Sequence, residues 1–267
     1  MGKKYHFGQK HYKIVEIKGK GLGCIALQDI EIGTLVMKLK FYKDADGHFI
    51  ADSPVNHSCR PNVSSFKLHR DLRMRTVSKI LAGQEIVRSY DQICLGMKNL
   101  NARQLHLSVN FGFTCVCDLC KEEEKCENNS EIYKKFQKLE KESYRLDSII
   151  FVEKMLTTPQ EIYAHCKNLM FCYKEMQKLA IKHKAPWEFI LVEIIEEGFE
   201  AGLHGYIEAK KRLDVDKIEY YIKECMKWSR VGEKMSKIAF GHDYKQISSL
   251  NWGEVNQNFD NWFAQNR

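Results

Sequence analysis

The sequence predicts an α+β protein in which a β-rich half precedes a helical half. Before about residue 125, short segments alternate between apolar and polar residues and are separated by glycine-containing turns. Beyond that point, apolar residues recur at the three- and four-residue spacing of a helix face. Ten glycines lie in residues 1–125 and six in residues 126–267. We therefore predict two domains with these bounds, joined near a polar run that begins at Lys121.

The first half contains five strand candidates. Tyr12–Ile17 alternates with a period of two residues and precedes Gly19, Gly21 and Gly23, which favour a flexible turn. The other candidates are residues 24–27, 34–39, 74–77 and 85–90. These segments do not alternate with helices as in βαβ units, so the glycines do not indicate a dinucleotide-binding fold.

The second half contains four regions with apolar residues at helical spacing. They include Ile132, Phe136 and Leu139; Ile162, Leu169, Met176 and Leu179; Phe189, Val192, Ile195 and Phe199; and Ile218, Ile222, Met226, Val231, Met235 and Ile238. Stripes of this width usually face other helices, so we predict antiparallel, TPR-like helical hairpins. Four further aromatic residues line either a peptide groove or the packed core, and we favour the core: Tyr173, Trp228, Trp252 and Trp262.

Composition excludes several classes of protein. The 267 residues are 44% hydrophobic and 29% charged, as in globular proteins. We find no apolar run of membrane-spanning length and no apolar signal core, which predicts an intracellular protein of the cytoplasm, the nucleus or both.

The net charge is unevenly distributed: residues 1–125 carry 20 basic against 13 acidic side chains, and residues 126–267 carry 22 against 22. We attribute the excess to scattered solubilising lysines, and do not expect direct nucleic-acid or membrane binding.

Three of the ten cysteines form a tight cluster, Cys115-Val-Cys117-Asp-Leu-Cys120. Such clusters in intracellular proteins favour zinc over disulfides, and a closed tetrahedral zinc site needs a fourth ligand. Cys126 is near in sequence, whereas Cys59 lies in the more informative segment Asn56-His-Ser-Cys-Arg-Pro-Asn62. The remaining cysteines show no paired spacing and are expected to be buried or idle thiols: Cys24, Cys94, Cys166, Cys172 and Cys225.

Several segments become informative when they are taken in order. They are Gly19-Lys-Gly21-Leu, Asp29-Ile-Glu-Ile-Gly33-Thr, Asn56 to Asn62, Ile80-Leu-Ala-Gly-Gln-Glu85-Ile-Val-Arg-Ser-Tyr90, Arg103-Gln, and Phe111-Gly-Phe-Thr-Cys-Val-Cys-Asp-Leu-Cys120. This succession resembles the SET-domain protein lysine methyltransferases, especially the SMYD-like group, over about residues 12–120. The helical half resembles the C-terminal domain of that group more loosely.

The resemblance implies a fold and a set of roles. It implies a β-rich SET domain with a knot-like motif and a post-SET zinc segment, followed by the helical domain. It implies S-adenosylmethionine binding by Lys18, Gly19, Lys20, Asn56, His57, Tyr90 and Phe113. It assigns the methyl-transfer point to the hydroxyl of Tyr90. It also implies one structural zinc ion held by Cys59, Cys115, Cys117 and Cys120.

Two positions depart from the family pattern. Phe111 stands where the family usually has a tyrosine that shapes the lysine channel, which bears on activity and on the number of methyl groups added. Residues 40–55 stand where the family normally has a longer helical insert, often with a zinc-binding MYND module. The Cys/His pattern of that module is absent, since no cysteine lies between Cys24 and Cys59. Either an internal segment has been lost or this SET domain is naturally compact. Asp46-Gly47 then turns a short hairpin that returns at Phe49-Ile50.

The sequence therefore predicts an enzyme that transfers a methyl group from S-adenosylmethionine to a lysine of a histone or another protein. The helical half is a candidate surface for protein partners. The short 40–55 segment and Phe111 motivate the alternative, a weak or inactive SET-derived adaptor that binds partners through its helical domain.

Overall fold

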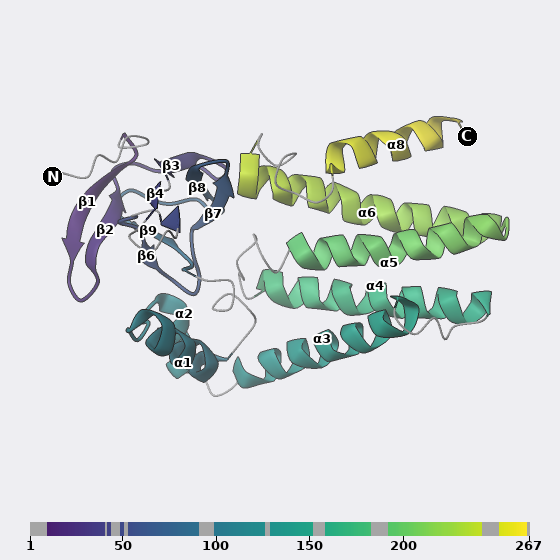
Figure 1. Ribbon diagram of the computed structural model, residues 1–267, viewed down its shortest axis with the longest axis horizontal. Coiled ribbons are helices and arrows are strands. Elements are labelled where there is room, and N and C mark those ends of the chain that lie inside the picture. Colours follow the sequence, from purple (N-terminus) through teal and green to yellow (C-terminus); the bar gives the residue numbers. More distant parts are fainter. Residues whose placement is uncertain are drawn as a thin grey trace. The chain divides into compact units, whose positions relative to one another are not determined.

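The computed structural model describes residues 10–40, 42–43, 49–50, 53–90, 99–125, 129–151, 158–182, 192–241 and 251–265. They form two compact units (Figure 1). The first unit contains the sheets, two short helices and the end of the sixth helix from Ser236 onward. The second unit contains the long helices. The predicted α+β class is thus confirmed.

A four-stranded sheet in the first unit joins distant parts of the sequence. Its order is β1 (Tyr12–Ile17), β2 (Gly21–Ala26), β9 (Glu85–Arg88) and β6 (Asn56–His57). Strands β1, β2 and β9 pair antiparallel, whereas β6 runs parallel to β9. Because β9 lies between β2 and β6, the turn after β1 and the start of the Asn56 segment are brought to one sheet.

Three further strands form a second sheet, β3 (Leu35–Lys40), β8 (Asp71–Thr76) and β7 (Val63–Leu68), in that order. All its pairs are antiparallel. The predicted hairpin within the short 40–55 segment is present as β4 (Tyr42–Lys43) paired with β5 (Phe49–Ile50). Its predicted turn at Asp46-Gly47 lies outside the described residues.

Apolar side chains from both sheets share one core. The fully buried members include Cys24, Val36, Met37, Val63, Met74, Ile80 and Ile86. They come from β2, β3, β7, β8 and β9 and from the bridge between Ile30 and Ile80. Their burial stabilises the scaffold by roughly 1.5–3 kcal/mol for each large side chain.

The side chain of Asn62 forms two hydrogen bonds with the backbone of β9. Replacement of Asn62 by alanine is therefore expected to destabilise the domain. The Asn62 amide nitrogen donates to the Glu85 carbonyl at 2.8 Å, and its amide oxygen accepts from the Val87 N–H at 2.8 Å. Removal of two partly buried hydrogen bonds should lower the free energy of unfolding by about 2 kcal/mol in urea denaturation. Asn62→Asp keeps the acceptor for Val87 but sets a carboxylate oxygen against the Glu85 carbonyl, so it should lose at least as much as the alanine variant. Equal stability of all three proteins would contradict this role.

Two short helices complete the first unit. Helix α1 (Leu100–Phe111) begins after Asn99, whose side chain accepts from the Ala102 N–H, and ends at Gly112. Helix α2 (Asp118–Glu124) begins directly after Cys117. Leu107 of α1 and Leu119 of α2 pack with Cys59, Cys115 and Cys120 in a small core of their own. Cys115 and Cys117 therefore lie in the connection between the helices, and Cys120 lies in the first turn of α2.

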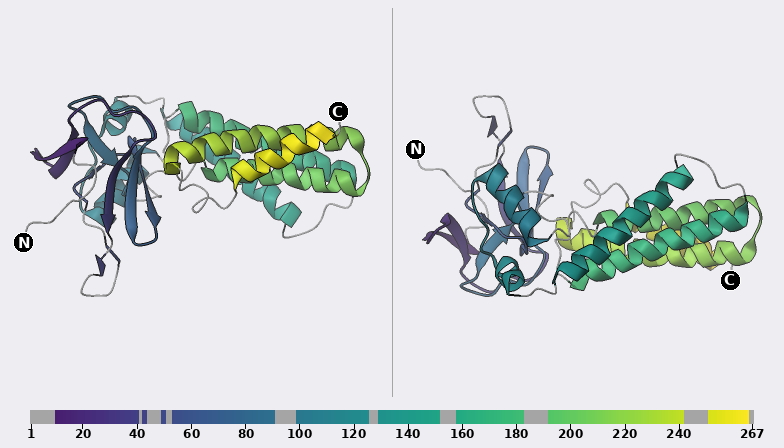
Figure 2. Two further views of the ribbon diagram at one scale, coloured as in Figure 1. Left: turned by 90° about the horizontal axis from the view of Figure 1, so that it is seen from above. Right: turned by 90° about the horizontal axis from the view of Figure 1, so that it is seen from below.

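The second unit consists of long helices that run side by side in both views of Figure 2. They are α3 (Asn129–Phe151), α4 (Pro159–Lys182), α5 (Val192–Lys211), α6 (Val215–Phe240, up to Met235 in this unit) and α8 (Trp252–Gln265). The Tyr221 hydroxyl of α6 donates to the Tyr163 carbonyl of α4 at 2.9 Å, and Ser229 of α6 contacts Asn256 of α8 at 2.6 Å. The predicted helical hairpins are present; a TPR-like arrangement stays a prediction.

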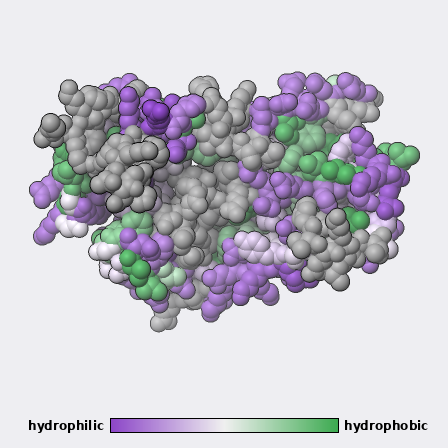
Figure 3. Space-filling model, in the orientation of Figure 1, coloured by the Kyte–Doolittle hydropathy of each residue, from purple (hydrophilic) through white to green (hydrophobic). Residues whose placement is uncertain are grey.

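Several expectations about burial are confirmed. Tyr173, Trp228 and Trp252 are buried, which favours the core interpretation over a peptide groove, and the side chain of Trp262 lies outside the described residues. The thiols predicted to be idle are buried: Cys24, Cys166, Cys172 and Cys225, with Cys94 outside the described residues. On the face in Figure 3 the described surface is mostly hydrophilic. Among the described helices, none is long and apolar enough to cross a membrane.

Candidate functional site

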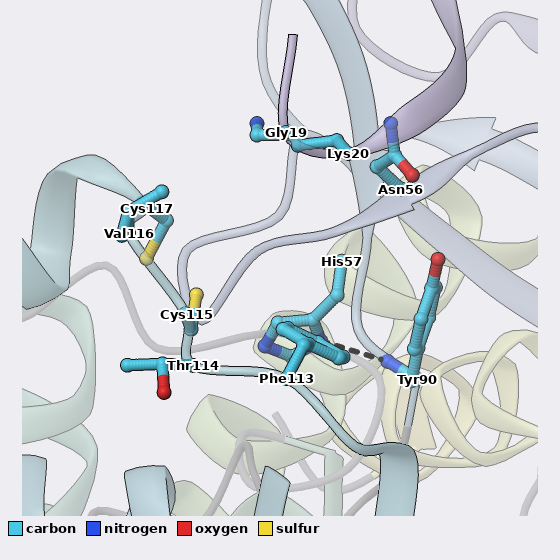
Figure 4. A pocket seen from close by; sticks show the side chains of 10 residues that line it. All are labelled: Gly19, Lys20, Asn56, His57, Tyr90, Phe113, Thr114, Cys115, Val116 and Cys117. Carbon is cyan, nitrogen blue, oxygen red and sulfur yellow. Dashed lines mark hydrogen bonds between the residues drawn. The ribbon is translucent and has the colours of Figure 1, made fainter. Parts of the chain in front are cut away.

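A pocket of about 220 Å³ opens in the first unit, between the β1–β2 turn and the loop that joins α1 to α2 (Figure 4). It is lined by Gly19, Lys20, Asn56, His57, Tyr90, Phe113, Thr114, Cys115, Val116 and Cys117. Six of the seven residues that the resemblance assigns to the cofactor are therefore together. The seventh, Lys18, lines a neighbouring cavity instead.

Two glycines shape the sheet side of the pocket. Gly19 lies in the turn after β1 with φ of +78°, a left-handed conformation that other residues adopt only at a cost. Gly23 of β2 lies close to the Asn56 side chain, because a Cβ at this position would stand 2.8 Å from Asn56 Nδ2. The left-handed backbone of the turn at Gly19 and the close approach of Asn56 to β2 at Gly23 thus each favour glycine.

Glu85 holds two of the pocket residues, a role that the sequence did not indicate. The carboxylate accepts from Lys20 Nζ at 2.6 Å and from Asn56 Nδ2 at 2.9 Å. Glu85 opens β9, which lies between β2, directly after the turn that carries Lys20, and β6, which carries Asn56. The arrangement fixes a cation and an amide side by side at the polar end of the pocket.

His57 connects the pocket with the cysteine cluster. Its Nδ1 accepts a hydrogen bond from the Tyr90 backbone N–H at 3.2 Å, drawn as the dashed line in Figure 4. In a neutral imidazole the proton therefore lies on Nε2, which is 3.4 Å from Cys59 Sγ and can donate to it. His57 thus fixes the backbone of the residue that the resemblance places at methyl transfer.

The aromatic rings of His57, Tyr90 and Phe113 also line the pocket. The Tyr90 ring lies 5.4 Å from the His57 ring, 6.1 Å from Phe113 and 5.5 Å from Phe111, measured between centroids. The Arg88 guanidinium carbon stands 4.9 Å from the Tyr90 ring centre. Phe111 is 40% exposed and so lies at the rim of this aromatic cluster.

Burial raises the pKa of the Tyr90 hydroxyl, although the positive charge of Arg88 opposes that shift. A tyrosine already has a pKa of about 10 in water. The Tyr90 hydroxyl is therefore a neutral phenol at physiological pH, able to donate and to accept a hydrogen bond but not to act as a resident base.

The four predicted ligand sulfurs meet beside the pocket. Cys59 Sγ is 3.9 Å from Cys115 Sγ and 3.7 Å from Cys120 Sγ, and Cys117 and Cys120 are also 3.7 Å apart. All four sulfurs lie within 4.8 Å of one another. A regular tetrahedron with Zn–S bonds of about 2.3 Å has edges of about 3.8 Å, so these distances fit a zinc ion.

The buried thiols shift one another's pKa values in opposite directions. Hydrogen bonds from Cys117, Cys120 and Cys59 hold the pKa of Cys115 far below its ordinary value. Hydrogen bonds with Cys115, Cys117 and Cys120, together with burial, raise the pKa of Cys59 well above it. Without a cation the cluster resists full ionisation, whereas a divalent metal would stabilise all four thiolates.

A second cavity of about 450 Å³ shares Lys20, Val116 and Cys117 with the first. Lys18 and Lys121 contribute to its walls. Lys18 and Lys20 flank Gly19. Lys18 lines the larger cavity, whereas Lys20 lines both cavities. The family resemblance assigned the same cofactor role to both lysines and did not predict this difference.

Comparison with known proteins gives a family match within the first half of the chain. Residues 39–91 match the family model of the SET domain. The matched segment includes Asn56, His57 and Tyr90, which line the pocket. It also includes Cys59 of the sulfur cluster.

Curated proteins that match parts of this chain carry the names of enzymes. Histone-lysine N-methyltransferase SET5 of Vanderwaltozyma polyspora is 37% identical over 89 residues, 33% of this chain and 17% of that protein. Its namesake in Schizosaccharomyces pombe is 28% identical over 167 residues, 43% of this chain and 51% of that protein. Histone-lysine N-methyltransferase ATXR4 of Arabidopsis thaliana is 37% identical over 79 residues, 28% of this chain and 23% of that protein. The chain thus spans about half or less of these relatives.

A solved Plasmodium falciparum structure, described as a candidate histone methyltransferase, also matches. The match covers 31% of this chain and 94% of that one at 18% identity, with a TM-score of 0.26. That score is too low to support an argument about the fold.

Proposed function

We propose that this protein is a protein-lysine methyltransferase that uses S-adenosylmethionine. The observation that carries the proposal is the coincidence of the SET-domain match with the pocket, since Asn56, His57 and Tyr90 belong to both. The names of the relatives support lysine in a histone as the acceptor, and a lysine in another protein is equally compatible with the pocket. A histone substrate would place the protein in the nucleus, at least in part.

The pocket has suitable chemistry for this cofactor. Lys20 and Asn56 supply polar groups for the methionine end, and the backbone at Gly19 is open to close approach. The rings of His57, Tyr90 and Phe113 supply flat surfaces for an aromatic base and a sulfonium cation. When bound, S-adenosylmethionine supplies a methyl group on a positively charged sulfur.

Methyl transfer then needs alignment rather than a covalent enzyme intermediate. The lone pair of a neutral lysine amine forms the new N–C bond while the C–S bond breaks and its electron pair returns to sulfur. Holding these atoms in line lowers the barrier by several kcal/mol. Aromatic walls disfavour the ammonium form of the incoming lysine, and the proton on the methylated amine leaves to water. The neutral Tyr90 hydroxyl orients the polarised methyl group through weak C–H···O contacts.

The cysteine cluster is proposed to hold one structural zinc ion, bound by Cys59, Cys115, Cys117 and Cys120. The sulfur distances support this ligand set. The ion would link the Asn56–Asn62 segment, proposed as part of the knot-like motif, to the post-SET loop that lines the pocket. The Cys-x-Cys-x-x-Cys spacing also supports the SMYD-like subgroup, with 40–55 as a shortened insert and the helical unit as a candidate partner-binding domain.

Cofactor binding is the deciding experiment. Isothermal titration of the full chain with S-adenosylmethionine should give saturable binding, and tritiated cofactor should label a lysine in core histones or in cell lysate. His57→Ala, which removes a pocket wall, should weaken binding at least tenfold, whereas Lys178→Ala on the exposed face of α4 should not. Absence of binding would overturn the enzyme assignment. Tight binding without transfer to any protein would favour the adaptor alternative.

Phe111→Tyr is expected to reduce the number of methyl groups added to each lysine. Phe111 stands 5.5 Å from the Tyr90 ring and 6.2 Å from His106 at the rim of the aromatic cluster. A hydroxyl here adds volume and a hydrogen-bond partner for the substrate amine. It therefore hinders the rotation of the methylated amine that a second transfer requires. Mass spectrometry of the modified peptide should show a several-fold lower ratio of higher to single methylation. An unchanged ratio would place Phe111 outside the lysine channel.

A further inference from the structure

A buried ion pair lies next to the cysteine cluster. Arg103 of α1 and Glu123 of α2 lie 2.8 Å apart, between Nη2 and Oε2, with side chains only 2% and 3% exposed. The Arg103-Gln segment belongs to the ordered motifs of the sequence, but neither the pocket nor the sulfur ligands account for its arginine. A buried ion pair is costly to desolvate and is seldom a net source of stability, so its presence calls for another explanation.

The arginine also contacts a sulfur. The same Nη2 atom lies 3.8 Å from Cys120 Sγ, so its two hydrogens can point to the Glu123 carboxylate and to the sulfur. Next to it on α1, the Gln104 side chain donates to the Cys115 carbonyl at 2.6 Å and accepts from the Cys115 N–H at 2.8 Å. Successive residues of one helix thus hold two different members of the cluster.

The positive charge of Arg103 complements the negative charge of the proposed zinc centre. Four thiolates around a divalent zinc ion carry a net charge of −2 in a core that is largely shielded from water. A guanidinium beside Cys120 compensates part of that charge. Glu123 holds the guanidinium in place, and as a pair the two residues are neutral but present their positive end to the sulfur. Partners of this kind orient metal ligands and tune their affinity.

We infer that Arg103, held by Glu123, is a positioning residue that retains zinc in the four-cysteine centre. This inference rests on the zinc centre proposed above. The guanidinium acts through Cys120 and does not bind the metal, so its removal should speed zinc release without removing a ligand.

The test compares zinc release from full-length variants to a chromogenic chelator. Arg103→Met alone leaves Glu123 buried without its arginine and is expected to fold poorly. The double variant Arg103→Met/Glu123→Met replaces both charges by apolar side chains, so it should fold while releasing zinc at least tenfold faster than the wild type. Arg103→Lys keeps a charge but not the planar fork, and should release zinc at an intermediate rate.

Glu122→Gln is the matched control. Glu122 lies on the same helix as Glu123, and the substitution breaks its exposed ion pair with Arg60. Its zinc release should stay within twofold of the wild type. In cobalt-substituted protein, the thiolate-to-metal absorption should shift in the Arg103 variants and not in the control.

The outcomes are distinguishable. A folded double variant with wild-type zinc release and cobalt absorption would overturn the inference and leave the zinc centre intact. If the double variant does not fold, Arg103→Lys decides, and wild-type release and absorption in that variant would overturn the inference. A wild-type chain purified without zinc, and unable to take it up, would overturn the centre and the inference together.

Discussion

Replacing Cys59 by alanine should remove zinc from the protein and weaken cofactor binding at least tenfold. The Cys59 sulfur closes the tetrahedron with Cys115 and Cys120, and it lies 56 residues before the next member of the cluster. Structural zinc binding supplies apparent free energies of about 10–16 kcal/mol, as large as the whole net stability of a typical domain. Loss of one ligand therefore releases the loop whose residues Phe113 to Cys117 form a wall of the pocket.

Elemental analysis and calorimetry measure the two effects separately. The wild type should contain one zinc per chain, and Cys59→Ala close to none. Cys24→Ala is the matched control, because Cys24 is equally buried in the same unit but lies in the sheet core, where burial raises its pKa to about 12. It should lose stability but keep its zinc. Cys126→Ala should also keep it; zinc loss there, with retention in Cys59→Ala, would replace Cys59 by Cys126 in the ligand set.

The strands were predictable wherever the alternation of apolar and polar residues is regular. β1 has the predicted bounds, Tyr12–Ile17, because apolar and polar residues alternate over most of it and a glycine-containing turn follows. β7 (Val63–Leu68) was missed, since Ser64 occupies a buried position and is followed by a second serine. A sequence pattern treats both serines as polar and exposed, whereas the sheet buries the first completely.

The helices were predictable as elements but not in every packing detail. On α6 the predicted stripe includes Ile218 and Met226, which are only half-buried. The structure buries Ile222 and Met235 of that stripe and also Tyr221, which lies outside it, together with the separately predicted Cys225 and Trp228. A helix that contacts neighbours on more than one side has no single stripe, so aromatic and thiol side chains outside the expected face become core residues.

The site was predictable to the extent that ordered motifs carry it. Asn56, His57, Tyr90 and Phe113 come from segments far apart in sequence and line one pocket, although their roles toward the cofactor stay predictions. Supporting residues were not predictable in the same way. The contacts of Glu85 with Asn56 and of Gln104 with Cys115 depend on which strands and helices become neighbours, which the periodicity of a single segment does not contain.

Tyr90→Phe should slow methyl transfer by about 10- to 100-fold while changing cofactor affinity by less than about threefold. The substitution keeps the ring contacts with His57 and Phe113 and the backbone hydrogen bond to His57. It removes only the hydroxyl, and the loss of its weak C–H···O contacts and of one polar partner in a partly buried site costs roughly 1–3 kcal/mol. Single-turnover transfer from tritiated cofactor gives the rate, and calorimetry gives the affinity.

The pH profile separates orientation by Tyr90 from proton removal. Because burial raises the Tyr90 pKa, its hydroxyl stays protonated to a higher pH than the ordinary value of about 10. The wild-type rate should therefore climb with pH as the substrate lysine, with a pKa of about 10.4 in water, becomes neutral. Tyr90 ionisation should produce no fall within that range. Tyr90→Phe should show the same rising limb at a lower rate, whereas disappearance of that limb in the variant would make Tyr90 the base and contradict the alignment mechanism.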